Sequence, residues 1–424
     1  MVQELANEIY NHSIAGDFTT RRPGGYDSSL AAGADRFIWE NPEMLVVVAA
    51  GNSGLKESPY GQIQDVAVAK NVLTVGACET KNPLKWRPEG GGQLRYHRFC
   101  RDGNPSKMAS FSSRDPAYTN NSIVHQPPFR WKTDVVAPGV AILSTKARGR
   151  AALGSKFGSS WDDDYFFDSG TSMAAPMVAG AAALLREAIQ ERRGITQPSA
   201  ALLKAILINT TDDLKTSDDP AASPPRAMPA DGGGAPAPAP APGSSSGGAA
   251  RPAPPSVNPA PDAVQGFGRV NIPRAILLAM DTKVGTCYDR QSITADIPGG
   301  LPLASSELEP AGSSHRYTLP IPPGVTSTLA VTMCYADSPG TALQNVISLK
   351  ATSGAMTHYG NDTAYQVPDI RPPLNTPDQR NNVQKIVWDR VPGTVEVVVW
   401  CSHFDPSGAR PLTFAIAWII TTRT

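Results

Sequence analysis

Ser172 is the residue whose type and setting could most directly do chemistry, because it lies among small residues in the segment 168–180. Apolar spacing predicts a helix over 173–189, with matches at Met177, Ala181, Leu184, Leu185 and Ala188. Ser172 would then lie at the N-terminus of that helix, where unpaired amides and the positive end of the helix dipole favour negative charge. This placement suits a serine nucleophile whose tetrahedral adduct carries an oxyanion.

A capping role is the alternative for Ser172, since serine is also a preferred residue at helix N-termini. Pro176 cannot donate an amide to the carbonyl of Ser172, four residues earlier. We expect proline to be tolerated there because the first turn of a helix leaves its amides unpaired. Chemistry alone therefore leaves Ser172 as a cap or a nucleophile.

The motif Gly-Thr-Ser-Met-Ala-Ala-Pro-x-Val-Ala-Gly, which starts at Gly170, resembles the block around the catalytic serine of the subtilisin-like serine proteases. It differs from the Gly-x-Ser-x-Gly elbow of the α/β-hydrolases, because Ala174 stands where the second glycine would be, and this disfavours an esterase. The resemblance implies a serine endopeptidase that acts on proteins or peptides through an acyl-enzyme on Ser172. It also implies that Gly170 and Thr171 contact the substrate.

Upstream, the pattern indicates α/β architecture. Residues 28–40 have helical apolar spacing and end at Asn41-Pro42, which is a stop signal. Residues 44–50 form a valine-rich apolar run, typical of a strand buried on both faces of a parallel sheet. A turn at 51–54 follows, so its polar groups would lie at the carboxyl end of that strand, where such sheets bind ligands.

Asn52 by itself is an ordinary turn asparagine next to glycine. Within the resemblance it matches the family's Ala-Ala-Gly-Asn block, whose asparagine amide donates to the oxyanion. The resemblance also makes Ala49, Ala50 and Gly51 one wall of the pocket for the side chain before the scissile bond.

Other blocks match the family in the same order along the chain. They lie at 66–76, 108–113, 132–144, 199–209 and 265–271. Polar or proline-rich segments between them are interpreted as insertions, at 79–107, 118–131 and 220–261, and the last is expected to be disordered. We therefore predict part of a subtilase catalytic domain over 1–282.

The remainder, 283–424, is predicted to be an all-β domain, because short alternating runs are separated by turn residues. It resembles the C-terminal jelly-roll domain of one subtilase branch. The fold class is thus an α/β parallel-sheet domain followed by a jelly-roll β-sandwich. That branch usually has an Asn-Asp-Leu-Asp-Leu strand where this chain has Gln344-Asn345-Val346-Ile347-Ser348-Leu349, so the calcium that relatives carry is not transferred to these residues.

Composition argues against several function classes. Lysine plus arginine equals aspartate plus glutamate, 38 each, which gives no reason to expect nucleic acid or a membrane surface as a partner. Five scattered cysteines do not make a disulfide framework or a zinc site. His97 with Cys100, and His125, lack further ligands, and the acids at 162–164 with Asp168 are better interpreted as a solvated loop than as a calcium site. These residues predict no metal site, while the family resemblance leaves calcium as a possible cofactor.

A subtilase needs an Asp and a His ahead of its serine, and neither motif is found before Asn52. His12 lacks the neighbouring glycine and threonine of the family's histidine block and is not expected to be the base. The chain resembles a subtilase without its front half, so that absent part becomes an expected partner. The alternative is a non-catalytic subtilase remnant that acts as a peptide- or protein-binding module. The family implies secretion, but the first residues have no signal-peptide pattern, so the residues do not decide the compartment.

Overall fold

A computed structural model describes the greater part of the chain. The described ranges are 9–12, 29–54, 62–63, 65–80, 104–114, 117–118, 129–146, 164–214, 261–262, 264–293, 314–321, 325–361, 377–405 and 411–423. Most of the three predicted insertions lies outside these ranges, and the expected disorder of 220–261 stays a prediction.

The first part of the chain is built on a four-stranded parallel sheet in the order β1-β2-β3-β6. Its strands are β1 (Ile9–His12), β2 (Leu45–Ala49), β3 (Leu73–Cys78) and β6 (Val135–Pro138). Every residue of β2 and β3 is buried, which confirms the prediction of a strand with two covered faces. The block at 66–76 is only partly a strand, because η1 (Asp65–Val68), a 3-10 helix, occupies its first residues.

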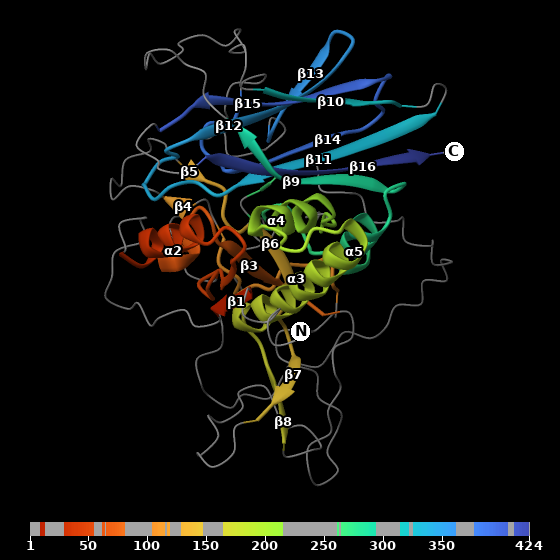
Figure 1. Ribbon diagram of the computed structural model, residues 1–424. Coiled ribbons are helices and arrows are strands. Elements are labelled where there is room, and N and C mark those ends of the chain that lie inside the picture. The colour runs from red at the N-terminus through yellow and green to blue at the C-terminus, as the bar shows by residue number, and fades with distance from the viewer. Residues whose placement is uncertain are drawn as a thin grey trace, which may run out of the picture.

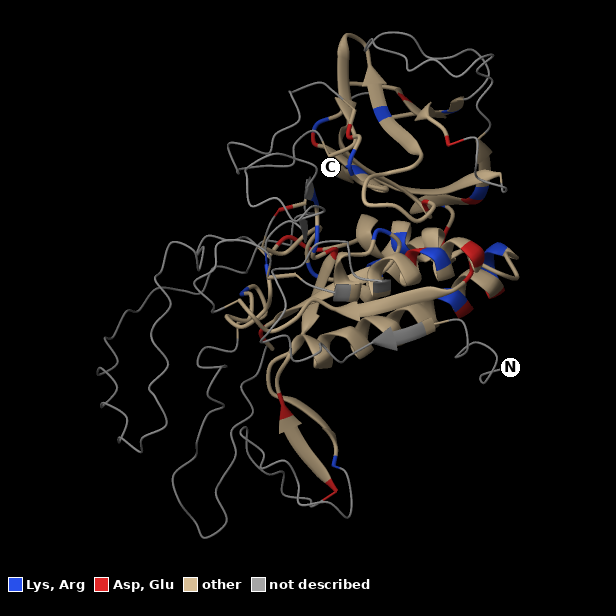
Figure 2. Cartoon of the chain, turned by 90° about the vertical axis from the view of Figure 1, so that its left-hand side faces the viewer, with Lys and Arg blue, Asp and Glu red and all other residues tan. Residues whose placement is uncertain are grey.

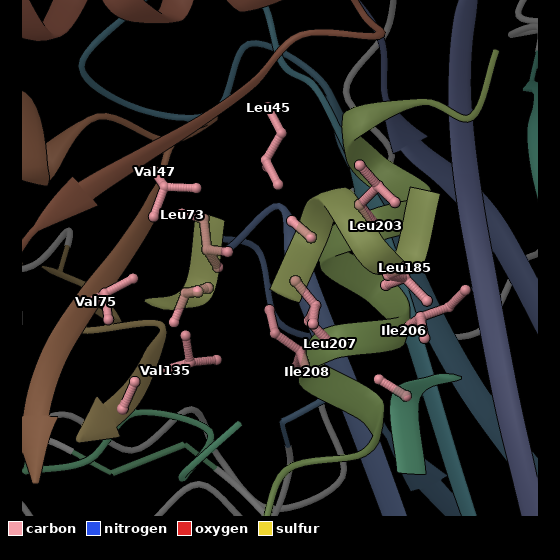
Figure 3. Close-up of a cluster of buried hydrophobic side chains, with 14 of the residues drawn as sticks. Leu45, Val47, Leu73, Val75, Val135, Leu185, Leu203, Ile206, Leu207 and Ile208 are labelled. Carbon is pink, nitrogen blue, oxygen red and sulfur yellow. The ribbon is translucent and has the colours of Figure 1, made fainter. Parts of the chain in front are cut away.

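Helices cover both faces of this sheet. On one face, α2 (Ser29–Glu40) and η1 pack against Val46 and Val48 of β2. On the other face lies α3 (Thr171–Arg193), with α4 (Ala200–Asn209) and α5 (Ile272–Met280) beside it (Figure 1). Figure 3 shows the resulting core, in which sheet side chains such as Val47 and Val75 face Leu185 of α3 and Leu203 of α4.

Side-chain caps fix where two of these helices begin. The hydroxyl of Ser199 accepts a hydrogen bond from the amide of Leu202 at 3.0 Å, and the side chain of Asn271 accepts one from the amide of Arg274 at 3.0 Å. The block at 199–209, whose sequence also predicts a helix, is thus found as α4 with Ser199 as its cap.

The face that α3 buries agrees with the predicted spacing at Ala181, Leu185 and Ala188 but not at Met177 and Leu184. Met177 and Leu184 are exposed, and the buried stripe consists of Ala174, Ala175, Val178, Ala181, Ala182, Leu185, Ala188 and Ile189 with Thr171 and Arg186. Small residues dominate this stripe, so the backbone of the helix can lie close to the sheet. Among the described helices, α3 alone is long and apolar enough to cross a membrane by length and composition, and half of its most apolar 18-residue window is buried in the protein.

The second part of the chain consists of two four-stranded antiparallel sheets. One has the order β14-β11-β16-β9, with strands Val383–Trp388, Thr326–Tyr335, Leu412–Arg423 and Gly285–Ile293. The other has the order β10-β15-β12-β13, with strands Ser314–Leu319, Val395–His403, Val346–Ser353 and Met356–Tyr359. Side chains from both sheets share one apolar core, so the sheets pack face to face as a sandwich.

Strand β16 belongs to two cores at once. Ile416 and Trp418 lie in the core between the two antiparallel sheets, while Ala415, Ala417 and Ile419 lie in the core that includes α3, α4 and α5. The helices are therefore a layer between the parallel sheet and the sandwich (Figure 1).

Buried polar contacts also join the two parts. The ammonium of Lys70, next to η1, lies 2.6 Å from a carboxylate oxygen of Asp337, and both side chains are 0% exposed. Lys70 also donates to the carbonyl of Ser338, and Asn71 donates to the carbonyl of Asp337 at 2.8 Å. On the helical layer, Lys385 of β14 donates to the carbonyl of Ile208 at 2.9 Å.

Two short antiparallel pairs complete the fold. β4 (Ala117–Tyr118) pairs with β5 (Phe129–Arg130), and β7 (Ile142–Thr145) pairs with β8 (Tyr165–Asp168). Figure 2 shows the β7–β8 pair extending from the body of the protein, and charged residues of both signs are interspersed over the two parts. The β8 strand leads directly into Gly170 and the start of α3.

Candidate active site

The candidate site lies at one edge of the parallel sheet. The strands β2, β3 and β6 run in the same direction, so their carboxyl ends meet at this edge. The turn at 51–54 follows β2, Gly139 follows β6, and the N-terminus of α3 lies against Gly139. Three segments that are far apart in the sequence therefore converge here.

Gly139 allows the start of α3 to approach the sheet closely. The amide of Gly139 donates to the carbonyl of Cys78 at 3.0 Å, and the amide of Gly170 donates to the carbonyl of Gly139 at 2.8 Å. A Cβ atom at residue 139 would lie 2.7 Å from the carbonyl oxygen of Gly170 and 2.7 Å from the Cβ of Ala77. Any side chain at residue 139 would push the helix away from β3.

Asn52 and Thr171 are in direct contact across this edge. The amide of Thr171 donates to Oδ1 of Asn52 at 2.9 Å, and the Thr171 hydroxyl lies 3.1 Å from the same oxygen. The Thr171 hydroxyl also accepts a hydrogen bond from the amide of Gly51 at 3.1 Å. Because a backbone amide can only donate, the contacting atom of Asn52 must be its oxygen, which leaves its Nδ2 group as the donor that faces outward.

That donor lies beside the N-terminus of α3. The Nδ2 atom of Asn52 is 3.5 Å from the position that a Cβ of Gly170 would occupy, and Asn52 is exposed. Ser172 is the second residue of α3 and is partly buried. The structure thus brings Asn52, Gly170, Thr171 and Ser172 together.

Ser172 is not the N-cap of its helix. The capping residue is Gly170, in extended conformation and without a side-chain cap bond. Pro176 is the sixth residue of α3, so it lies beyond the first turn and the expected reason for its tolerance is wrong. Instead, Pro176 leaves the carbonyl of Ser172 without its intrahelical hydrogen bond, and Pro176 lies on the exposed side of the helix.

The three residues expected to form a pocket wall are held tightly by their surroundings. The side chains of Ala49 and Ala50 are buried in the cores on opposite faces of the sheet. Gly51 has a φ of 105° and is buried. Only the backbone of Ala49 and Ala50 is therefore available to a substrate at this edge.

Of the other reactive groups singled out from the sequence, His12, Asp164 and Asp168 belong to the described residues. His97, Cys100 and His125 lie outside the described residues, as do Asp162 and Asp163. His12 ends β1 in register with Val48, and Asp168 accepts a hydrogen bond from the amide of Ser169 at 2.7 Å. Within the described part of the chain, no group of three His, Cys, Asp or Glu side chains is arranged to hold a metal ion.

Cys78 is a nucleophilic residue type close to the site, but its environment keeps it inert. It is fully buried at the end of β3, and burial raises the pKa of its thiol to about 12. The thiolate needed for attack is thus suppressed at neutral pH.

The chain is similar to one known protein family and to several individual proteins. The model of the subtilase family matches residues 1–267. Serine protease AprX of Bacillus subtilis is 32% identical over 176 residues, which is 41% of this chain and 32% of that protein. Subtilisin-like protease SBT3 of Solanum lycopersicum is 39% identical over 194 residues, or 45% of this chain and 23% of that protein.

A third relative is much longer. The serine protease/ABC transporter B family protein tagB of Dictyostelium discoideum is 28% identical over 248 residues, or 45% of this chain. These matches span between 12% and 32% of the length of the three relatives.

Proposed function

Because the chain belongs to the subtilase family, we propose that it hydrolyses peptide bonds as a serine endopeptidase, with Ser172 as nucleophile and Asn52 as oxyanion donor. The observation that carries this proposal is the contact between Asn52 and Thr171. It orients the Asn52 amide so that its N–H groups are available beside the helix start on which Ser172 lies.

The chemistry follows from this arrangement. The hydroxyl oxygen of Ser172 attacks the carbonyl carbon of the scissile bond while a base takes the hydroxyl proton. The carbonyl oxygen becomes negative and accepts a hydrogen bond from Nδ2 of Asn52, near the positive end of the α3 dipole. Collapse of the adduct releases the amine, which takes up a proton, and water then hydrolyses the acyl-enzyme.

We assign the substrate to the backbone-lined edge formed by Ala49, Ala50 and Gly51 on one side and Gly170 with Thr171 on the other. Buried alanine side chains and two glycines leave main-chain groups at this edge, which suits an extended peptide that pairs through its own main chain.

The base and its orienting acid are proposed to come from a segment that precedes the described residues. Two features favour this proposal. Among the described strands, β1 pairs with β2 alone, so one edge of the parallel sheet is open to a further strand. In addition, Met177 and Leu184 are exposed apolar side chains on α3, the helix that begins beside Ser172.

Labelling with a fluorophosphonate probe tests the proposal. We expect the chain alone to react very slowly, because loss of the histidine in a subtilisin lowers kcat by about two million-fold. The same chain combined with an N-terminal segment that carries the family's Asp and His should be labelled, and Ser172→Ala should abolish that labelling.

Two results would change the assignment. Rapid labelling of the chain alone would mean that it already contains a base, and substitutions at His12, His97 and His125 would identify it. A combined protein that is not labelled but still retains peptides would be a non-catalytic binding remnant.

For residues 283–424 we infer a jelly-roll connectivity within the sandwich. Its support is the face-to-face packing of two four-stranded antiparallel sheets around one core.

A further inference from the structure

A loop at 108–114 lies beside the candidate site and is fixed to the parallel sheet. The amide of Ala109 donates to the carbonyl of Ala77 at 2.9 Å, and the amide of Ala77 donates to the hydroxyl of Ser112 at 3.0 Å. Met108 forms a backbone bridge with Cys78. The loop is therefore anchored on the end of β3, which is a rigid element of the fold.

The opposite side of the same loop holds the turn that carries Asn52. The amide of Ser113 donates to the carbonyl of Gly51 at 2.9 Å, and the hydroxyl of Ser113 accepts a hydrogen bond from the amide of Ser53 at 3.0 Å. These two bonds bracket Asn52, one on each neighbouring residue. Ser113 is 0% exposed, so water does not replace its hydroxyl in the folded chain.

Glycines let the turn and the loop approach this closely. A Cβ at residue 51 would lie 2.9 Å from the hydroxyl oxygen of Ser113, and one at residue 54 would lie 2.2 Å from the carbonyl oxygen of Ser112. The turn thus fits against the loop through its backbone, and a shift of the loop would be transmitted to Asn52.

We propose that Ser113 is a positioning residue that fixes the Asn52 amide for the oxyanion, a role that rests on the proposed function. Thr171 holds the side-chain oxygen of Asn52 from α3, while Ser113 holds the backbone on either side of Asn52 from the sheet. The turn is also held by the amide of Gly51, which donates to the Thr171 hydroxyl, and by the amide of Gly54, which donates to the carbonyl of Phe111. The Ser113 hydroxyl adds the contact to Ser53, the residue directly after Asn52. Oxyanion donors contribute most when they are held in place before the reaction.

The first test uses the chain as it is and needs no activity. In a sample with labelled asparagine, the side-chain NH₂ signals of Asn52 are assigned by their loss in Asn52→Asp. Ser113→Ala should shift and broaden these signals, because Ser53 then has no acceptor for its amide. Ser113→Thr keeps the hydroxyl and should restore them.

Ser112→Ala is the matched control. It removes a buried hydroxyl from the adjacent residue, but that hydroxyl contacts Ala77 and not the turn. Two backbone contacts to Ala77 and Cys78 keep the loop anchored in this variant. Unchanged Asn52 signals in Ser113→Ala, or equal changes in Ser112→Ala, would overturn the proposal.

Folding and activity are controlled separately. If Ser113→Ala does not fold, Ser113→Cys keeps the volume with a much weaker acceptor and serves for the same measurement.

In the protein combined with the Asp- and His-bearing segment, Ser113→Ala should slow fluorophosphonate labelling about tenfold, less than the hundred- to thousandfold loss for a whole oxyanion donor. In a protein that already carries Asn52→Ala, adding Ser113→Ala should not slow the labelling any further. A wild-type protein that is never labelled would refute the proposed function, while the NMR result would still decide the role of Ser113.

Discussion

At the scale of single residues, Thr171 links the nucleophile's helix to the oxyanion donor. Its hydroxyl is both an acceptor for the amide of Gly51 and a donor to Oδ1 of Asn52, so one side chain organises two groups on the facing turn. Thr171 was expected to contact substrate, and the structure gives its side chain a structural task in addition.

We predict that Thr171→Val destabilises the chain by about 1–3 kcal/mol, because the buried amide of Gly51 loses its acceptor. Thr171→Ser keeps the hydroxyl and should unfold close to the wild-type urea midpoint. Urea denaturation of both variants checks this, and equal midpoints would show that the hydroxyl is not needed.

The sequence predicts only those site residues that lie in recognisable motifs. Ser172 and Asn52 stand in distinctive motifs, and the structure places them at one edge of the sheet. Ser113 was not singled out, since its partners are the main-chain groups of Gly51 and Ser53, which carry no residue-specific signal. The block 108–113 was noted for its match, but nothing in its residues indicated what they hold.

At the scale of elements, α3 shows how neighbouring leucines take opposite roles. Leu185 is 0% exposed and packs against the parallel sheet, while Leu184 is 55% exposed. The helix sits in the middle of the fold, yet it keeps a second face uncovered in the described part of the chain.

We predict that Leu185→Ala lowers the free energy of unfolding by about 2–5 kcal/mol, since it leaves a cavity in the core. Leu184→Ala on the adjacent position should change it by less than about 0.5 kcal/mol. The pair is compared by chemical denaturation. A large loss in Leu184→Ala would mean that another segment covers this face.

Element prediction from sequence succeeded where periodicity was strong. The helix at 28–40 and the strand at 44–50 are found near their expected bounds. The same holds for the five alternating runs of the all-β part, at 328–335, 346–351, 385–388, 394–400 and 412–420, which correspond to β11, β12, β14, β15 and β16. β9, β10 and β13 were missed, because their residues alternate between partly exposed and exposed positions or lie at a sheet edge. For α3, three of the five residues that gave the helical spacing are buried (Ala181, Leu185 and Ala188), while Met177 and Leu184 are exposed because tertiary packing buries neighbouring alanines instead.

At the scale of the whole molecule, the parallel-sheet part and the sandwich are held together by a buried ion pair. Asp337 accepts hydrogen bonds from the amides of Gln344 and Asn345 as well as from Lys70. Its carboxylate therefore organises the sandwich side of the interface, and the Lys70 ammonium provides the link across it.

We predict that Asp337→Ala costs about 3–5 kcal/mol, because it leaves the Lys70 ammonium buried without a counter-charge. Lys70→Met should cost less, since two backbone amides still stabilise the Asp337 carboxylate. The exposed pair Arg316–Glu396 is the control, and Glu396→Ala should cost less than about 1 kcal/mol. Similar losses in all three variants, measured by calorimetry, would contradict this ranking.

The stability of the whole chain should depend on pH through its buried lysines. Burial lowers the pKa of Lys385 from 10.5 to about 7, with Arg274 acting in the same direction and Asp213 and Asp212 in the opposite one. Burial also lowers the pKa of Lys132 to about 8, although Asp134 opposes this shift. The unfolded chain binds these protons up to about pH 10.5, so stability rises from about pH 7 towards that value.

Buried thiols limit the pH range over which the stability of the chain rises. Burial raises the pKa of Cys78 and of Cys334 from 9.0 to about 12, so the unfolded chain loses these protons first and the two thiols lower stability from about pH 9 upward. We expect the urea midpoint to rise between pH 7 and pH 9, to level off up to about pH 10.5 while the lysine and thiol contributions oppose each other, and to decline above that pH. Lys385→Met should make the urea midpoint rise less between pH 7 and pH 9. A urea midpoint that falls from pH 7 to pH 9 would refute the lowered pKa of the buried lysines.

The double burial of β16 has a consequence for synthesis on the ribosome. The strand covers α4 with Ala415, Ala417 and Ile419, but it is translated long after α4. At about 5–20 residues per second, this delay is about 10 to 40 s, during which the apolar helix has no sandwich to cover it. The nascent chain therefore offers a chaperone an extended interval for binding, and chains stalled before Leu412 should be cut by protease within Ala200–Asn209 much faster than released chains.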